Sequence, residues 1–491
     1  MAYVLAIDQG TSSSRAVVFD AQGRAIGSSQ HALDASYPQP GWVEQDPEAI
    51  WQTTLAAGRG AIADAGVDAS RIDAIGIANQ RETTLLWEAE GGRSVCPAIV
   101  WQDRRTADHC RRIVADGMEA EVRATTGLVV DPYFSATKLA RMLDVGDMRR
   151  RAEANELRFG TVDTFLISRL TGGHSHVTDA TNASRTMLYD LERHEWSETL
   201  ADYLDIPRPL LPSLADTVGD FGIADPEWFG TAIPIRAVAG DQQAALAGQG
   251  CTRAGEAKCT FGTGCFLLAH TGTTPVHATS KLLTTVASRI GGASAYALEG
   301  SVFNAGVAVK WLRDRLGLIV SAAETEDAAR RIGGDTDGVV VVPAFTGLGA
   351  PHWEPDARGL VTGLTLDTGP DQIITATLKG IAFQVADLLA AMATEGVGIH
   401  DLRVDGGMVV NDWFCEFLAD ITAHEVQRPA NIETTVAGAG RLALFGAGLI
   451  SGLEARSDTT QSGHRFAPQV DSRQRKAWRD EWQAAVRKAI A

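Results

Sequence analysis

Two short segments, one near the amino terminus and one near the middle of the chain, share a pattern that constrains the fold more than any other feature. Residues 3–7 and 16–19 are apolar and flank a turn-forming stretch at residues 9–14. Residues 259–268 repeat this arrangement around Gly262-Thr263-Gly264. Apolar runs on either side of a Gly- and Thr-rich turn predict β-hairpins. Two such hairpins indicate that the chain consists of two similar halves.

The length of the chain supports the same interpretation. At 491 residues it exceeds what one hydrophobic core usually serves, so at least two domains are expected. Strand-like and helical segments alternate through both halves, which is typical of α/β layers. We expect the two domains to comprise residues 1–250 and 251–491. The expected strands are residues 72–77, 98–101, 235–239, 339–342 and 402–404, and the expected helices are residues 47–63, 138–143, 372–392, 412–422 and 473–490.

The charge of the chain disfavours several classes of partner. A formal net charge of −17 would repel a nucleic-acid backbone or an anionic membrane surface, and no run of basic residues is longer than residues 149–151. The amino terminus lacks the basic segment of a signal peptide, and no apolar stretch is expected to span a bilayer. We therefore expect a cytoplasmic protein that binds neither nucleic acid nor membranes.

The six cysteines show no C-x-x-C pair and no zinc-ligand spacing, so neither a disulfide framework nor a structural metal is expected. Cys265 lies beside the second Gly-rich turn and is a candidate reactive thiol. No base or cation is evident next to it in the sequence, so a buried, unreactive thiol is the favoured interpretation.

Neither of the two common nucleotide-binding motifs, Gly-x-x-x-x-Gly-Lys-Ser/Thr and Gly-x-Gly-x-x-Gly after a strand, occurs in the chain. A turn of Gly, Thr and Ser is another way to hold phosphate, because its N–H groups and hydroxyls point into one concavity. Asp8 and residues 10–13 form such a cradle, Arg15 adds a positive charge, and residues 262–264 would face it. Asp8 is also a suitable carboxylate for Mg²⁺. Each hairpin alone is compatible with an ordinary turn, and their recurrence favours the phosphate cradle.

Asp241 lies between the expected strand at residues 235–239 and a helical stretch. It is compatible with two roles. It could cap the helix. A carboxylate at the end of a strand in an α/β layer could instead accept a hydroxyl proton during phosphoryl transfer. Spacing alone does not separate these two interpretations.

Arg81 and Glu82 follow the expected strand at residues 72–77 and combine a hydrogen-bond donor with an acceptor. They could form an exposed pair in a solvated loop, which would contribute little to stability. The same combination also complements the hydroxyl groups of a neutral polyol. Trp101, Tyr133 and Phe266 stand next to polar loops, where their default role is core packing, although flat rings also suit the C–H surface of a small polyol.

Together these motifs resemble the FGGY carbohydrate kinases over nearly the whole chain. Seven motifs occurring in order make the resemblance specific. They are residues 8–15 (DQGTSSSR), 79–84 (NQRETT), 131–135 (DPYFS), 240–245 (GDQQAA), 261–266 (FGTGCF), 343–351 (PAFTGLGAP) and 405–407 (DGG).

The resemblance implies an α/β fold in which two ribonuclease-H-like domains, as in actin, hexokinase and Hsp70, flank an ATP cleft. Within the family the match is closest to members that phosphorylate glycerol. It implies that Asp241 is the catalytic base and that Asp8 positions Mg²⁺. The residues implied to hold glycerol are Arg81, Glu82, Trp101, Tyr133, Asp241, Gln242 and Phe266. The residues implied to surround ATP are Thr11, Ser12, Ser13, Arg15, Thr263, Gly306, Lys310, Gly407 and Asn411.

The chain departs from the family pattern at a few positions. Arg141 stands where Trp is usual, Lys310 where Gln is common, and Arg441 where the residue is usually uncharged. The loop at residues 225–232 has no basic residue, which argues against regulation by fructose 1,6-bisphosphate. The family resemblance implies a homodimer or homotetramer.

Two other functions compete with this interpretation. The first is a kinase of another polyol or a ketose on the same scaffold, against which the Arg81–Glu82 pair argues. The second is a non-enzymatic nucleotide switch like the actin and Hsp70 relatives of the fold, which would have no use for a cluster complementary to a polyol.

Overall fold

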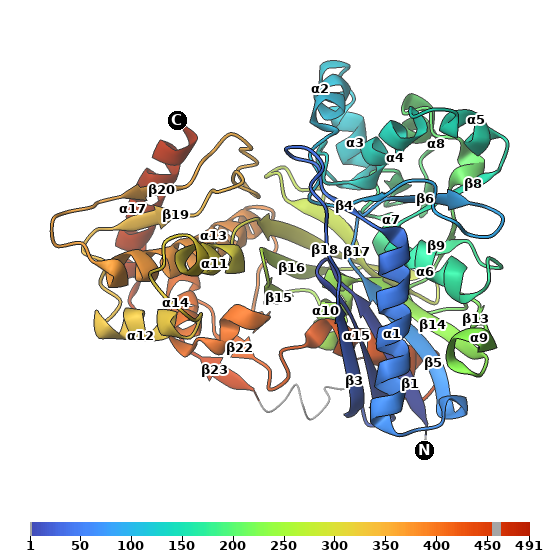
Figure 1. Cartoon of the computed structure of the whole chain (residues 1–491). Helices are drawn as coiled ribbons and strands as arrows, with labels where there is room; N and C mark the ends of the chain where they lie inside the picture. Colours follow the sequence, from blue (N-terminus) through green and yellow to red (C-terminus); the bar gives the residue numbers. More distant parts are fainter. Residues whose placement is uncertain (1, 454–462) are drawn as a thin grey trace.

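The computed structural model describes residues 2–453 and 463–491, and two large sheets form its framework. The strands of the first sheet follow the order β13-β14-β5-β1-β2-β3, and those of the second the order β17-β18-β16-β15-β21-β22-β23. Figure 1 shows the two lobes built around these sheets. The first sheet contains β1 (Tyr3–Gln9), β2 (Ser13–Asp20), β3 (Ala25–Ala32), β5 (Ile72–Asn79), β13 (Ile223–Ala224) and β14 (Ile233–Gly240). The second contains β15 (Glu256–Phe261), β16 (Cys265–Gly272), β17 (Leu283–Ile290), β18 (Ala293–Val302), β21 (Asp401–Asp405), β22 (Val426–Arg428) and β23 (His464–Phe466).

Shorter strands and the helices complete the two lobes. The short strands are β4 (Glu44–Gln45), β6 (Leu85–Glu88), β7 (Ala98–Ile99), β8 (Leu157–Gly160), β9 (Val177–Asp179), β10 (Tyr189–Asp190), β11 (Glu195–Trp196), β12 (Ser213–Ala215), β19 (Val340–Val342) and β20 (Leu360–Thr362). The helices of the first half are α1 (Pro47–Ala65), α2 (Ala107–Ala115), α3 (Glu119–Thr126), α4 (Ser135–Leu143), α5 (Met148–Glu153), α6 (Val162–Leu170), α7 (Ala180–Ala183), α8 (Glu198–Tyr203), α9 (Pro226–Phe229) and α10 (Asp241–Gly248). Those of the second half are α11 (Gly306–Asp314), α12 (Glu324–Arg331), α13 (Pro370–Thr394), α14 (Asp412–Thr422), α15 (Thr434–Gly446) and α17 (Ser472–Ile490).

Both predicted hairpins are confirmed. β1 pairs antiparallel with β2, and β15 pairs antiparallel with β16. Each hairpin continues into a parallel neighbour, because β1 also pairs with β5 and β15 with β21. The two sheets therefore begin from the same arrangement of a hairpin beside a parallel strand, as the repeated sequence pattern indicates.

Three parallel strands of the first sheet end at one level. In the register of the sheet, Gln9 of β1 lies opposite Asn79 of β5, and Asn79 lies opposite Gly240 of β14. Ligands bind beyond the carboxyl ends of strands in sheets of this kind, because the following loops converge there. The residues that follow these three strands are therefore brought to one edge.

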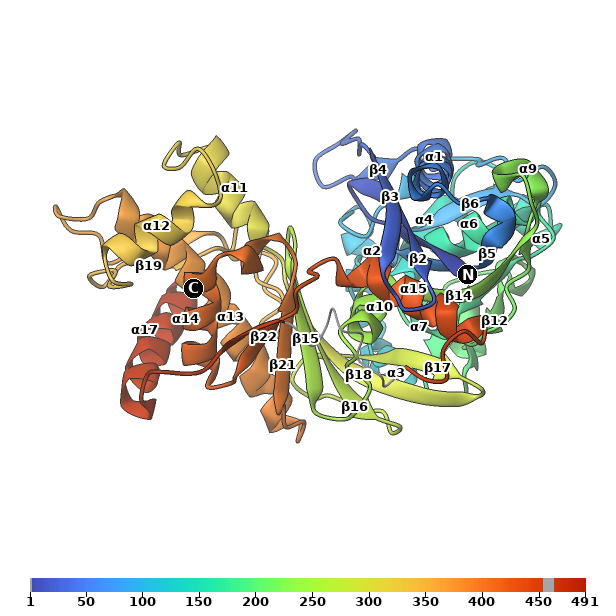
Figure 2. The ribbon, with the colours of Figure 1, turned by 90° about the horizontal axis from the view of Figure 1, so that it is seen from below.

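The helix α15 returns from the second half of the sequence to the first lobe. In Figure 2 it lies next to α10 and beneath the strands of the first sheet. Glycine permits this contact: a Cβ atom at Gly438 would lie 1.8 Å from the carbonyl oxygen of Ala244, and one at Gly248 would lie 2.1 Å from that of Thr434. The predicted division at residue 250 does not include this return, and the domain limits stay a prediction.

Two expectations from the sequence need correction, and a third is confirmed in a small separate sheet. The strand expected at residues 98–101 is shortened to β7, because the chain turns at Trp101, and β7 pairs with β4 in a two-stranded sheet. The strand expected at residues 339–342 is confirmed as β19, which pairs with β20 in a two-stranded sheet. The helix α13 is long and apolar enough to span a membrane, contrary to the expectation that no stretch of the chain could do so. However, 89% of its most apolar 18-residue stretch is buried in the second lobe. It is the core helix of that lobe.

The close contact between α10 and α15 leads to a prediction about stability. We expect Gly438→Ala to lower the free energy of unfolding by about 1–3 kcal/mol, because the added methyl group must push the two helices apart. Urea denaturation followed by circular dichroism measures this change. Gly398→Ala is the control, since a Cβ atom there meets nothing within 4 Å. Equal stability of the two variants would contradict the tight packing of α15 on α10.

Candidate active site

The converging strand ends place the predicted catalytic and substrate residues around one cavity of about 360 Å³. Asp8 belongs to β1, Arg81 and Glu82 follow β5, and Asp241 begins α10 directly after β14. Asp241 does not cap that helix, since the cap residue is Gly240. All of the residues predicted to hold a polyol line this cavity: Arg81, Glu82, Trp101, Tyr133, Asp241, Gln242 and Phe266.

The two hairpins line another side of the same cavity. Asp8 and most of the predicted phosphate-binding residues line it, namely Thr11, Ser12, Ser13, Arg15 and Thr263. Arg15 forms an ion pair with Glu433, which stands just before α15. The hairpins of the two halves therefore face one cavity, as the sequence analysis predicts.

Four residues of the predicted nucleotide set lie outside this cavity, in the second half of the chain. The N–H group of Gly306 donates to the carbonyl of Gly262 at 3.0 Å, which places it against the second hairpin. Asn411 caps α14 by accepting a hydrogen bond from the N–H group of Phe414 at 2.8 Å. Lys310 and Gly407 are exposed. Their contact with a nucleotide stays a prediction.

Arg81 is the centre of a buried set of charges. Its Nε atom lies 3.1 Å from Oδ1 of Asp241, and its two terminal nitrogens donate to Glu299 at 2.6 and 3.0 Å. Arg81 and Glu82 are 2% and 1% exposed, so the interpretation of a solvated surface pair is wrong. Asp241 keeps a side chain that is 29% exposed, and it therefore remains accessible from the cavity.

Glu82 adopts a strained backbone conformation with φ = 61°. Its carbonyl oxygen accepts hydrogen bonds from Thr84 at 3.0 Å, from Ser135 at 3.1 Å and from Lys138 at 3.2 Å. A left-handed conformation is costly for a residue other than glycine and persists where its surroundings hold it in place. The three donors supply that support and direct the Glu82 side chain into the cavity. Burial lowers the pKa of Lys138 to about 7.

The amide of Gln242 is oriented by a buried lysine. Nζ of Lys258, on β15, donates to Oε1 of Gln242 and also to Oγ1 of Thr260 at 2.8 Å. Because the amide oxygen is occupied by this ammonium group, the amide nitrogen is the end available to a ligand. Gln242 is therefore arranged to donate a hydrogen bond to a substrate oxygen.

Three aromatic rings form one wall of the cavity. The ring of Trp101 meets that of Tyr133 edge-on with a centroid separation of 5.6 Å, and that of Phe266 at 6.1 Å. The indole Nε1 of Trp101 donates to Oγ1 of Thr11 at 2.8 Å, which fixes the ring next to the first hairpin. The wall offers a flat apolar surface opposite the charged groups, and this combination suits a small molecule with both hydroxyl and C–H groups.

Asp8 lies among like charges. Burial raises its pKa to about 7, with further contributions from Asp241 and Glu433, while Arg15 opposes the shift. A carboxylate in such a setting is stabilised by a bound cation. Among the residues that the structure describes, no group of three or more His, Cys, Asp or Glu side chains could hold a metal ion alone. One carboxylate combined with substrate phosphates is the ligand set that Mg²⁺ commonly uses.

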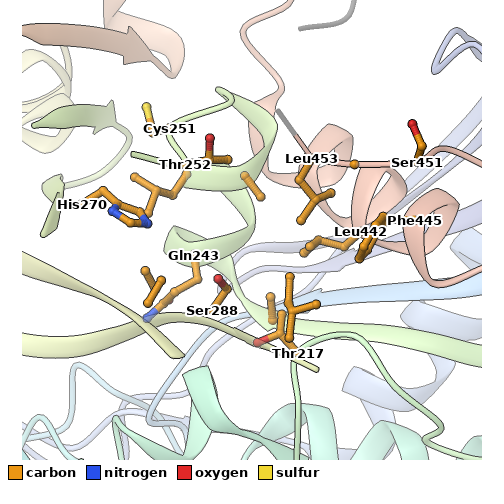
Figure 3. A pocket seen from close by; sticks show the side chains of 17 residues that line it. Thr217, Gln243, Cys251, Thr252, His270, Ser288, Leu442, Phe445, Ser451 and Leu453 are labelled. Atoms are coloured by element: carbon orange, nitrogen blue, oxygen red, sulfur yellow. The ribbon is translucent and has the colours of Figure 1, made fainter. Parts of the chain in front are cut away.

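A second cavity of about 560 Å³ lies on another face of α10. Figure 3 shows Gln243, Leu442 and Phe445 around it. Among the described residues, those that line it include no Asp, Glu, Lys or Arg. It therefore lacks the charges that phosphate transfer needs, and α10 separates it from the site that has them.

Several residues of the site were missed by the sequence analysis. Arg185, Glu299 and Lys258 are fully buried and charged, and they contact Glu82, Arg81 and Gln242. They lie in stretches without a local motif. The signal that the sequence offered was a charged residue placed among apolar neighbours. The Cys265 thiol is fully buried, which agrees with the favoured unreactive interpretation, and all six cysteines are free.

Comparison with known proteins agrees with this arrangement. Residues 3–248 match the N-terminal domain of the FGGY family of carbohydrate kinases, and residues 257–447 match its C-terminal domain. The chain is 52% identical over 487 residues to "Glycerol kinase 1" of Pseudomonas aeruginosa, covering 99% of this chain and 98% of that protein. It is 52% identical over 496 residues to a glycerol kinase of Rhodospirillum rubrum, covering 100% and 99% of the two chains.

Solved structures show the same fold. The chain superposes on a glycerol kinase of Plasmodium falciparum, solved with ADP, with a TM-score of 0.93 and 33% identity, covering 100% of this chain and 99% of that one. A gluconate kinase from Lactobacillus acidophilus gives a TM-score of 0.87 at 20% identity, covering 99% and 98% of the two chains. The latter likeness concerns the fold alone.

The raised pKa of Asp8 predicts how stability depends on pH. A carboxyl group whose pKa is higher in the folded state stabilises the fold fully below its unfolded pKa, and this stabilisation is lost as pH rises through about 7. Relative to the wild type, Asp8→Asn should therefore raise the free energy of unfolding by on the order of 2 kcal/mol more at pH 8 than at pH 4. Urea denaturation at the two pH values measures the difference. The exposed Asp34→Asn is the control, and the same pH response in both variants would contradict the raised pKa of Asp8.

Proposed function

The chain belongs to the FGGY family of carbohydrate kinases, and we propose that it transfers the γ-phosphoryl group of ATP to a terminal hydroxyl of glycerol, giving glycerol 3-phosphate and ADP. The observation that carries this proposal is one cavity that joins a polyol-complementary side to the hydroxyl-rich turns of two hairpins. Relatives named glycerol kinase, about half identical over nearly the full chain, support glycerol as the acceptor.

The polyol side of the cavity provides a partner for each kind of hydroxyl contact. Glu82 accepts a hydrogen bond, while Arg81 and the amide nitrogen of Gln242 donate. The aromatic wall of Trp101, Tyr133 and Phe266 covers the carbon side of the molecule. An acceptor that satisfies these groups is held with one terminal hydroxyl next to Asp241, and such positioning is a large part of the rate enhancement in phosphoryl transfer.

Asp241 acts as the general base. Its carboxylate takes the proton from the terminal hydroxyl as the oxygen attacks the γ-phosphorus, and the bond from that phosphorus to the leaving oxygen of ADP breaks. Arg81 holds Asp241 at 3.1 Å and thereby directs one carboxylate oxygen. The hydroxyls of Thr11, Ser12, Ser13 and Thr263, with Arg15, offer donors to the phosphate oxygens that carry the charge.

The surroundings of Asp8 fit Mg²⁺. Asp8 would hold the ion beside the phosphates, where it neutralises their charge during transfer. The raised pKa of Asp8 means that a bound cation would compete with a proton at this carboxylate near pH 7.

We further propose a cytoplasmic location and a dimeric or tetrameric assembly. The acidic composition and the burial of α13 support the location, and the family resemblance supports the assembly. Neither nucleic acid nor a membrane is expected as a partner.

The assignment of the base predicts the effect of Asp241→Asn. We expect the wild-type protein with Mg-ATP and glycerol to form glycerol 3-phosphate and ADP in equal amounts. The variant should lose about 10²- to 10⁴-fold in kcat, because the proton acceptor is removed. Coupled assays for both products measure the rates, and calorimetry checks that glycerol still binds.

The alternatives give different outcomes in the same assay. A panel of xylulose, ribulose, erythritol and gluconate tests the acceptor, and faster turnover of one of these than of glycerol would replace glycerol as the substrate. ATP hydrolysis without any phosphorylated acceptor would instead support a nucleotide switch.

The assignment of Asp8 predicts how the protein responds to magnesium. Removal of Mg²⁺ with EDTA should abolish turnover, and Asp8→Asn should raise the Mg²⁺ concentration needed for half-maximal rate by about 10-fold or more, because one charged ligand is lost. Titration of MgCl₂ at fixed ATP measures this. An unchanged Mg²⁺ requirement in the variant would remove Asp8 from the ion site.

A further inference from the structure

Glu299 on β18 is a carboxylate with no access to solvent, and it holds two arginines. It accepts hydrogen bonds from both terminal nitrogens of Arg81, at 2.6 and 3.0 Å, and from Nη2 of Arg185 at 2.9 Å. All three side chains are at most 2% exposed. Glu299 belongs to the second sheet, whereas both arginines belong to the first half of the chain. The contact therefore joins the two halves behind the polyol side of the cavity.

Each arginine in turn holds residues assigned to the reaction. Arg81 directs its Nε atom at Oδ1 of Asp241, at 3.1 Å. Arg185 donates from Nε to Oε1 of Glu82 at 2.7 Å, and its guanidinium lies 5.7 Å from the centre of the Tyr133 ring. One carboxylate thus sets, through two guanidinium groups, the positions of Asp241, Glu82 and Tyr133.

On the premise of the proposed function, we propose that Glu299 is a positioning residue for phosphoryl transfer to the polyol and that Arg185 is its counterpart. Glu299 contacts neither the acceptor nor the nucleotide side of the cavity, since it is absent from the cavity lining. Its role is to fix the two terminal nitrogens of the Arg81 guanidinium group, so that the third nitrogen, Nε, remains directed at Asp241. Arg185 fixes Glu82 in the same way.

The charges explain why this arrangement needs Glu299. Arg81 and Arg185 carry like charges side by side in a buried space, and both donate hydrogen bonds to the carboxylate of Glu299. Although burial opposes ionisation, Arg185 and Arg81 hold the pKa of Glu299 at about 2, so it stays charged throughout the working range. Without this charge the guanidinium group of Arg81 would turn toward the remaining carboxylate, Glu82. Oε1 of Glu82 already lies 3.9 Å from Nε of Arg81. Glu82 and Asp241 would then both move from the acceptor.

The contact also links the acceptor site to the arrangement of the lobes. Gln243 accepts from Nη1 of Arg81 at 3.3 Å, and its Nε2 atom donates to the carbonyl of Val286 on β17 at 3.1 Å. Glu299 and Val286 lie on neighbouring strands that pair with each other. Arg81 is therefore held by the β17–β18 ribbon of the second sheet at two points, and a shift of this ribbon would move the side chain that holds Asp241.

The test compares Glu299→Gln with the wild type. The amide keeps the shape of the side chain but removes the charge that both arginines share. We expect KM for glycerol to rise about 10- to 100-fold, which corresponds to the loss of one or two charged hydrogen bonds, and kcat to fall. KM for ATP should change less than about 3-fold, because the hairpins are untouched. The amount of ADP formed should exceed the amount of glycerol 3-phosphate, since water can replace a poorly held acceptor and take the phosphoryl group.

Two further variants keep the test decisive. Arg185→Lys retains the positive charge but cannot hold Glu82 and Glu299 together, so it should show the same excess of ADP. Asp387→Asn is the matched control: Asp387 is a buried carboxylate that accepts from Trp482 at 2.7 Å in the core of the second lobe. It should lower the melting temperature while leaving KM for glycerol and the one-to-one product ratio unchanged.

The outcomes separate this inference from the proposed function. If Glu299→Gln is folded and keeps the wild-type KM for glycerol and an equal ratio of products, the positioning role is wrong and Glu299 only stabilises the fold. If Glu299→Gln does not fold, the product ratio of Arg185→Lys decides in the same way. A wild-type protein that makes no glycerol 3-phosphate would instead overturn the proposed function.

Discussion

The buried ion pairs around Arg81 are the interaction on which the rest of the site depends. Removing charged groups from water is costly, and the cost is offset only when each group has well-placed partners. Arg81, Arg185, Glu82 and Glu299 offset most of this cost by pairing with one another, and Nη1 of Arg185 is the buried atom of this cluster that has no hydrogen-bond partner among the described residues. Since Glu299 comes from the second half of the chain, the pairing is complete only when the two halves are correctly placed. The acceptor side of the cavity is therefore a property of the whole fold.

The backbone around this cluster is arranged to serve the same purpose. Glu82 keeps a left-handed conformation that only a well-ordered environment can maintain, and Lys138 and Ser135 on α4 supply that environment. On the other side, Lys258 orients the amide of Gln242. Strain and buried charge, both unfavourable for stability, are concentrated where the acceptor would bind. Such a concentration is typical of functional sites.

Much of the fold could be predicted from local patterns. The hairpins around residues 10–13 and 262–264, the strand at residues 72–77 and the helix α13 all follow from turn residues and apolar periodicity, because these features act over a few neighbours. The strand expected at residues 98–101 is shorter than predicted, and β7 and β19 each belong to a two-stranded sheet that the sequence did not indicate. An apolar run indicates an extended buried segment, but the sheet it joins depends on which distant strand offers a free edge.

By itself the sequence determined the chemistry of the site: the carboxylates Asp8 and Asp241, the donor and acceptor pair Arg81 and Glu82, and the hydroxyl-rich turns, all within motifs short enough to be recognised.

Only the tertiary structure decided how these groups are held. Arg185, Glu299 and Lys258 lie in no local motif, and their importance arises from tertiary contacts: Glu299 pairs with Arg81 and Arg185, which are more than a hundred positions away in the sequence, and Lys258 on β15 contacts Gln242 on α10. The return of α15 to the first lobe was equally invisible, because the glycines that permit it have meaning only when the opposing helix is known. Local interactions are encoded by neighbouring residues, whereas charge pairing and close packing depend on which distant segments the fold brings together.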